Sequence, residues 1–181
     1  MGGMARTLAV SAVLVAVLCG TTWAVPAGRP EAVDALALCH AAARLEGAAR
    51  FEALERGLAL ATAALAADER DAAAHFATFC TLGRLVELRG LSVLRPFEAL
   101  RALDELDATL RLAPDDPDVL TAKGAALLRL PRVLGGDADA GRAWLRRALA
   151  RDPGHCAARA YLRAAEESVP VVGVVAAAGD C

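Results

Sequence analysis

Apolar and charged residues follow a helical period through the central part of the chain. Over residues 48–67 the apolar residues recur at steps of three and four, which places them on one face of a helix. Charged residues such as Glu52 and Arg56 fall off this stripe. The expected stripe of this helix is Phe51, Leu54, Leu58, Ala61 and Leu65. The expected apolar side of a helix over residues 71–89 is Phe76, Phe79, Leu82 and Val86.

Proline, glycine and aspartate residues divide this part of the chain into seven predicted helices. Proline is favoured in the first turn of a helix, so Pro30, Pro96 and Pro117 mark three starts. Asp116 and Asp137 stand where a side chain can cap the first turn of the fifth and sixth helices. The predicted helices cover about residues 30–45, 48–67, 71–89, 96–110, 117–130, 138–149 and from 153 onward.

The composition agrees with an all-α fold. Hydrophobic residues make up 56% of the chain but aromatic residues only 4%. The apolar residues are mainly Ala, Leu and Val, and a β-sandwich or barrel would need more β-branched and aromatic side chains. We therefore predict one helical domain over residues 25–168.

Residues 1–24 have the features of a signal peptide. A short positive start precedes the apolar run at residues 8–18, and small residues precede the expected cut. This run is about half of the roughly 20 residues that span a bilayer, so we expect cleavage and no membrane span afterwards. Cleavage after Ala27 fits nearly as well. Cys19 would anchor a lipoprotein, but Leu18 precedes it where a small residue is usual, so we favour a periplasmic or secreted protein.

The segment 169–181 breaks the helical pattern. It begins with a β-branched run, Val169-Pro170-Val171-Val172, and carries no charge before Asp180. We treat it as an apolar tail that either lies extended in a groove or is disordered. Exposed, such a run would favour aggregation.

Four cysteines lie beyond the leader, an even number in a chain that we expect to reach an oxidising compartment. The candidates for disulfide bonds are Cys39, Cys80, Cys156 and Cys181. Four cysteines allow three complete pairings, and the sequence does not choose among them. Buried free thiols, which pack as small hydrophobic groups, are the alternative.

Three segments share one pattern, in which small, large and small residues recur at steps of four and three and are followed by an acidic or proline turn. The triplets are Gly57-Ala61-Ala64, Ala102-Leu106-Thr109 and Gly141-Leu145-Ala148. Each small position allows a neighbouring helix to approach closely. Internal similarity of this kind indicates a repeat architecture.

The pattern resembles the tetratricopeptide repeat (TPR), whose second helix typically ends in Ala-Leu, two further residues and Asp-Pro. Residues 148–153 match in full, the copy ending at Pro114 has two departures, and the copy at residues 64–65 lacks the proline. The resemblance covers about residues 31–167 and implies a short α-solenoid of about three helix hairpins. The residues that carry it are Ala64, Leu65, Ala102, Leu106, Leu110, Pro114, Leu120, Gly124, Leu127, Gly141, Leu145, Ala148, Leu149 and Pro153.

The repeat spacing is longer than the family's. Leu65, Leu110 and Leu149 are 45 and 39 residues apart, against about 34 in the family. The extra residues fall at 87–96 and 131–137. The second of these loops, which ends in Gly-Gly-Asp, is similar to loops of bacterial extracytoplasmic TPR proteins associated with tripartite (TRAP-type) transporters.

Two Cys-His neighbours, Cys39-His40 and His155-Cys156, raise the possibility of a zinc site. Adjacent residues of a helix point about 100° apart, so one Cys-His pair rarely binds a single ion. The sequence also contains no Cys-x-x-Cys or His-x-x-x-His motif that would complete such a site. A thiol nucleophile would need Cys80 beside His75, but five residues of helix turn them about 140° apart. We therefore assign no catalytic, metal or cofactor-binding residue.

Several polar or aromatic features have a structural and a functional interpretation. Gly135-Gly136-Asp137 could hold an anion at a helix start, but a turn with an N-cap is the favoured interpretation. Trp144 is expected in the core, and the acids Asp104, Glu105 and Asp107 on a solvated helix face. An arginine-rich face either meets an acidic partner or pairs with nearby acids, which is the favoured interpretation; its members are Arg142, Arg146, Arg147 and Arg151.

The charge balance gives no sign of a nucleic-acid partner. Lys and Arg number 20 against 22 Asp and Glu, and the leader contains one basic residue and no acid. The mature chain is thus mildly acidic, without the basic surface that nucleic acid requires. The resemblance implies a scaffold for a protein or peptide partner, since stacked helix pairs form an extended concave surface. The alternatives are an accessory subunit of a periplasmic solute-transport system and a thiol- or metal-dependent enzyme.

Overall fold

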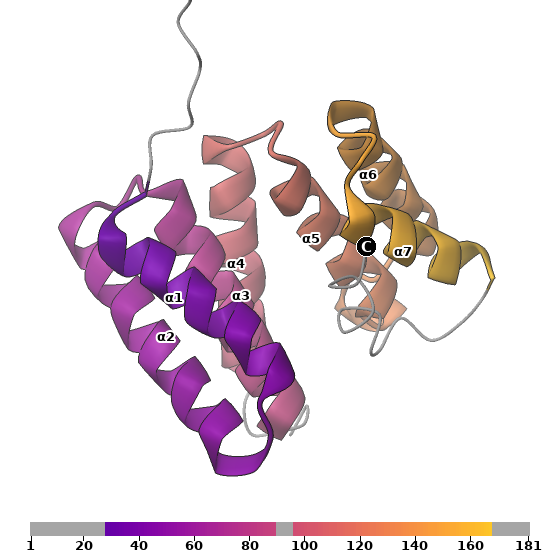
Figure 1. Cartoon of the computed structure of the whole chain (residues 1–181). Coiled ribbons are helices and arrows are strands. Elements are labelled where there is room, and N and C mark those ends of the chain that lie inside the picture. Colours follow the sequence, from indigo (N-terminus) through magenta and orange to yellow (C-terminus); the bar gives the residue numbers. More distant parts are fainter. Residues whose placement is uncertain (1–27, 90–95, 168–181) are drawn as a thin grey trace, which may run out of the picture.

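The computed structural model describes residues 28–89 and 96–167, and these residues form helices joined by short turns (Figure 1). The predicted all-α class is confirmed for this part of the chain. The leader 1–24 and the tail 169–181, with Cys19 and Cys181, lie outside the described residues. The elements are α1 (Pro30–Ala41), η1 (Ala42–Arg44), α2 (Gly47–Ala67), α3 (Ala72–Arg89), α4 (Pro96–Leu112), α5 (Pro117–Arg129), η2 (Arg132–Leu134), α6 (Ala138–Arg151) and α7 (Cys156–Glu166).

Consecutive helices pack as hairpins, and α3 is the most surrounded helix because it packs against α1, α2 and α4. The helices α5 and α6 pack closely, and α7 covers both. Contact between α4 and α5 is slight by comparison. Figure 1 accordingly shows α1–α4 side by side and α5–α7 as a second group next to them.

Small residues set the distance between paired helices. All nine residues of the three sequence triplets are buried, at equivalent positions in α2, α4 and α6. A Cβ added to Gly124 would lie 2.9 Å from the backbone oxygen of Gly141, and one added to Gly141 would lie 3.0 Å from that of Gly124. The backbones of α5 and α6 therefore approach to a distance that only glycine permits at this crossing.

The remaining repeat-signature residues occupy less enclosed positions. Leu120 is fully buried, and Pro114 and Pro153 lie exposed in the turns before α5 and α7. Four other leucines of the signature are half-buried: Leu65, Leu110, Leu127 and Leu149.

The apolar stripes of α2 and α3 differ from the sequence prediction. Phe51 is 39% exposed and lies under the Arg89 guanidinium, 5.1 Å from its ring centre. On α3, Phe76 and Phe79 are only half-buried and stack on each other. The buried side of α3 consists instead of Ala74, Ala77, Thr78, Thr81, Leu82 and Leu85. Three helices converge on α3, and this side carries alanine, threonine and leucine in place of aromatic rings.

The buried threonines of α3 satisfy their hydroxyl groups within the helix. Thr78 donates a hydrogen bond to the backbone oxygen of Ala74, and Thr81 donates to that of Ala77, both at 2.8 Å. Such bonding removes the cost of burying a hydroxyl without a partner. Thr residues can therefore substitute for apolar residues at this crowded crossing.

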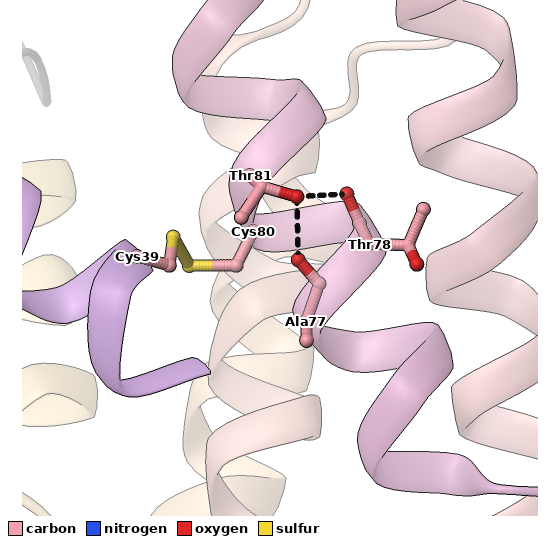
Figure 2. The surroundings of a disulfide bond; sticks show 5 residues. All are labelled: Cys39, Ala77, Thr78, Cys80 and Thr81. Atoms are coloured by element: carbon pink, nitrogen blue, oxygen red, sulfur yellow. Dashed lines mark hydrogen bonds between the residues drawn. A yellow bond between two sulfur atoms is a disulfide. The ribbon is translucent and has the colours of Figure 1, made fainter. Parts of the chain in front are cut away.

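Cys39 of α1 and Cys80 of α3 lie at disulfide-bonding distance, with a Cα–Cα separation of 6.2 Å (Figure 2). Cys156 pairs with no described residue and is a half-buried thiol. The Cys39–Cys80 bond ties together two helices that are 41 residues apart in the sequence.

The predicted caps of α5 and α6 are confirmed. Asp116 accepts hydrogen bonds from the backbone of Asp118 and Val119, and Asp137 from that of Asp139 and Ala140. The last helix begins at Cys156, later than predicted, because the side chain of His155 caps it by accepting from Ala158 N–H.

We predict that Gly124→Ala destabilises the protein by about 1–3 kcal/mol, because its methyl group would collide with the backbone of α6. The free energy of unfolding from urea denaturation measures the effect. Gly83→Ala in α3 is the matched control. A Cβ there meets nothing within 4 Å, so this change should stabilise the helix by about 0.5–1 kcal/mol. Equal effects of the two changes would contradict the close crossing.

We also predict that Cys39→Ala/Cys80→Ala lowers the free energy of unfolding by about 4 kcal/mol, because the bond closes a loop of about 40 residues in the unfolded chain. In the wild-type protein, alkylation without reductant followed by peptide mass spectrometry should modify Cys156 and leave Cys39 and Cys80 unmodified. Modification of Cys39 or Cys80 under these conditions would count against the bond.

Candidate functional site

Side chains from four helices approach one another where α3 meets the α5–α7 group. We call the set formed by Arg50 of α2, Arg84 and Glu87 of α3, Arg129 of α5 and Tyr161 of α7 the arginine cluster. Arg129 contacts Glu87 and Tyr161 directly, and Arg84 stands one helical turn before Glu87 on α3. The other four groups all act on the pKa of Arg84. His40 of α1 is exposed, and the charge of Arg84 acts on its pKa.

Arg129 links the two helix groups through this cluster. Its guanidinium forms an ion pair with Glu87 at 2.8 Å and donates a hydrogen bond to the Tyr161 hydroxyl at 3.4 Å. The guanidinium carbon also lies 5.6 Å from the centre of the Tyr161 ring, within the range of a cation–π interaction. Arg129 thus connects α3, α5 and α7, where direct helix packing is limited.

Arg84 and Arg50 have no comparable partner. Neither forms an ion pair with any described residue, and the buried Nε of Arg50 has no hydrogen-bond acceptor. Both side chains are only partly exposed. Burial is the main cause that lowers the pKa of Arg84, and Arg50 and Arg129 lower it further while Glu87 raises it. Arginine remains protonated in proteins, so both residues stay cationic.

The cluster also shifts the pKa of its two other titratable neighbours. Burial and the charge of Arg84 lower the pKa of His40, an effect that Asp118 partly offsets. Burial raises the pKa of Tyr161 above its ordinary value of 10.0, although Arg129 and Arg84 act in the opposite direction. Positive charge thus lowers the pKa of both groups, and for Tyr161 burial outweighs this effect.

His155 links the start of α7 to α5. Its Nδ1 accepts a hydrogen bond from the backbone N–H of Ala158 at 3.2 Å. Its Nε2 lies 3.0 Å from a carboxylate oxygen of Asp118. The imidazole thus caps α7 and engages Asp118, one of the charges that act on the pKa of His40.

His75 has two acceptors as its partners. Its Nδ1 lies 2.6 Å from a Glu105 carboxylate oxygen and its Nε2 lies 2.9 Å from the backbone oxygen of Glu69. His75 also lines a groove of about 620 Å³ between α2 and α4. Glu105, which we expected on a solvated face, is therefore mostly buried in this ion pair.

The structure does not bring the candidate enzymatic residues together. Cys80 bonds Cys39, and the His75 imidazole is engaged by Glu105. Among the described residues, no group of three or more His, Cys, Asp or Glu side chains could hold a metal ion.

The other sequence candidates have structural roles in the described part of the chain. Gly135 adopts a left-handed conformation with φ 91°, and Gly136 lies so close to Leu130 that a Cβ would clash with its backbone. The arginine-rich face of α6 pairs with acids: Arg147 and Arg151 bind Asp115, Arg142 binds Asp139 and Arg146 lies near Glu166. Trp144 packs partly against the core and carries Arg147 on its ring.

The arginine cluster had no counterpart in the sequence motifs. Its residues lie far apart in the chain and belong to four helices, so no local spacing indicates it.

Comparisons of the chain with protein-family models, with curated proteins and with solved structures found no match. Within residues 28–89 and 96–167, no helix is long and apolar enough to cross a membrane.

Tyr161 is the single tyrosine of the chain, so its ionisation can be followed without interference. We predict that it ionises at higher pH in the folded than in the unfolded protein, as measured by phenolate absorbance with and without urea. Because the unfolded chain loses this proton first, the free energy of unfolding should fall as pH rises through 10. Arg129→Gln should raise the folded pKa further, since Arg129 favours the phenolate. A folded value at or below the unfolded one would contradict the burial of this side chain.

Proposed function

We propose that this protein is an exported TPR-like scaffold that holds a protein or peptide partner through the arginine cluster. The observation that carries this proposal is the presence of two partly buried arginines, Arg50 and Arg84, that form no ion pair with a described residue; the buried Nε of Arg50 also has no hydrogen-bond acceptor. Leaving partly buried cations unpaired costs stability. A partner that supplies negative charge would offset this cost.

The repeat interpretation is supported by the equivalent burial of the three triplets and by the close crossing of Gly124 and Gly141. We propose that the hairpins α1–α2, α3–α4 and α5–α6 are three TPR-like units, with α7 covering the last one. In such an arrangement α1, α3, α5 and α7 would line one surface. The arginine cluster draws residues from three of these helices.

Export is supported by the Cys39–Cys80 pair, which is compatible with an oxidising compartment. We propose a periplasmic or secreted location and cleavage of the leader. We also propose that the protein is not an enzyme, because the chain's candidate nucleophile, Cys80, is engaged in the disulfide.

The test is capture of the partner by purified protein from the native envelope fraction, after chemical cross-linking. The wild-type protein should retain a reproducible partner, and Arg84→Gln should reduce its recovery about tenfold, since a hydrogen bond to a charged group contributes roughly 1.5–3 kcal/mol. Arg56→Gln is the matched control, because Arg56 is an exposed arginine of α2 outside the cluster. Equal recovery of the partner by the wild-type and Arg84→Gln proteins would show that the partner does not bind through the arginine cluster. Turnover of a small substrate without any retained partner would overturn the scaffold proposal.

A further inference from the structure

Asp71 is a buried acid at the start of α3, with 7% of its surface exposed. Its carboxylate accepts two backbone hydrogen bonds, from the N–H of Arg29 at 2.8 Å and from that of Ala74 at 3.1 Å. It forms no ion pair with any residue in the described part of the chain. A buried charge without a counter-charge is costly, and a carboxylate that accepts two hydrogen bonds still has capacity for a further donor.

Gly28 lies against this carboxylate. A Cβ added to Gly28 would lie 3.1 Å and 3.6 Å from the two Asp71 oxygens and would overlap the methyl group of Ala73. The Gly28 nitrogen is bonded to the same Cα, so it lies within about 6 Å of the nearer oxygen. Glycine, which has no Cβ, is therefore the residue that lets the backbone come this close to the start of α3.

The charge of the Gly28 nitrogen depends on whether the preceding peptide bond is intact. In the uncut chain this nitrogen belongs to a neutral amide. Hydrolysis of the Ala27–Gly28 bond consumes one water molecule and leaves a carboxylate on Ala27 and an amino group on Gly28, which is protonated at neutral pH. A carboxylate within about 4–6 Å stabilises such an ammonium group. Cleavage at this bond would thus supply the counter-charge that Asp71 lacks.

The residues that precede Gly28 fit a signal-peptidase cut at this bond. Ala27 stands directly before the bond, and the short side chain of Val25 stands two positions earlier, which resembles the A-x-A-like pattern of such sites. A cut after Ala24, with Thr22 two positions earlier, fits the same pattern. That cut would leave the Gly28 nitrogen in a neutral amide. The two positions are alike in sequence, and the buried carboxylate distinguishes them.

We propose that the leader is removed by cleavage between Ala27 and Gly28 and that the ammonium group of Gly28 then pairs with Asp71. The inference rests on the proposed export of the protein, and it adds the position of the cut and a binding site for the new amino terminus. The processed chain gains an ion pair that the precursor lacks, so processing stabilises the fold.

The other charges at this corner of the molecule do not take the place of Asp71. The Arg29 guanidinium lies 3.8 Å from the carboxylate of Glu31, and both side chains are exposed. The first turns of α1 and α3 carry fractional positive charges, which disfavour an ammonium group. The effect of Asp71 is therefore measured as a difference from a variant that retains both helix starts.

The first experiment determines the amino terminus of the exported protein. The full-length chain is produced in a bacterium that exports it, and the recovered protein is analysed by mass spectrometry of the intact chain and of its first peptide. We expect the mature chain to begin at Gly28. A chain that begins at Val25 would overturn the inference and leave the proposed export intact. An uncut chain retained inside the cell would contradict both.

The second experiment measures the pKa of the Gly28 amino group in the mature protein by NMR titration. Asp71→Asn should lower this pKa by about 1, because it removes the neighbouring negative charge while asparagine still caps α3. Asp68→Asn is the matched control, since Asp68 is an exposed acid of the same turn that accepts the Arg70 N–H at 2.9 Å. It should leave the pKa unchanged. The same pKa in the wild-type and Asp71→Asn proteins would overturn the ion pair.

A comparison of chains that begin at Gly28 and at Val25 measures the stabilisation. At pH 7 the Gly28 chain should have the higher midpoint of urea denaturation, because only this chain has an ammonium group beside Asp71. The ion pair raises the pKa of that group in the folded state. Its contribution is therefore present below the unfolded value of roughly 8 and is lost as the pH rises through the folded value, so the difference should vanish above about pH 10. Equal midpoints at pH 7 would contradict the inference.

Discussion

The close approach of paired helices is the constraint on which the rest of this structure depends. At the crossing of α5 and α6, each of Gly124 and Gly141 lies against the other's backbone oxygen, with no room for a side chain. Alanine takes the same role at several other crossings of α1, α2 and α3. Close crossings bring many backbone atoms into contact, and the resulting dispersion attraction compensates for a core with few large side chains.

A core built from small residues buries little apolar area per residue, so other interactions contribute to holding the helices. The Cys39–Cys80 bond joins α1 to α3 near the end of α1 (Figure 2). His40 follows Cys39 directly, and Arg84 stands one helical turn beyond Cys80. The bond therefore also fixes the relative positions of two residues at the arginine cluster.

The junction between α1–α4 and α5–α7 depends on polar contacts more than on apolar packing. Helices α4 and α5 make only slight contact, whereas Arg129 joins Glu87 of α3 to Tyr161 of α7. Polar interfaces between helix groups leave charged side chains accessible from one side. Arg129 accordingly reaches both a carboxylate and a hydroxyl group across this junction.

The sequence alone determined the helices, their order and much of their ends. Helix-forming residues, prolines in first turns and the caps Asp116 and Asp137 act locally, so their effect can be read from a few neighbouring residues. The three triplets also marked buried positions correctly, because small residues at steps of four and three identify the side of a helix that a neighbour approaches. Only the tertiary structure decided which large side chains remain outside, as with Phe51 and the Phe76–Phe79 pair, since three helices converge on α3 and its buried side carries alanine, threonine and leucine. It alone paired Cys39 with Cys80 among the open alternatives, and it alone assembled Arg50, Arg84 and Arg129. These arrangements depend on how separate helices cross, and the distance and angle of each crossing are set by the packing of the whole chain.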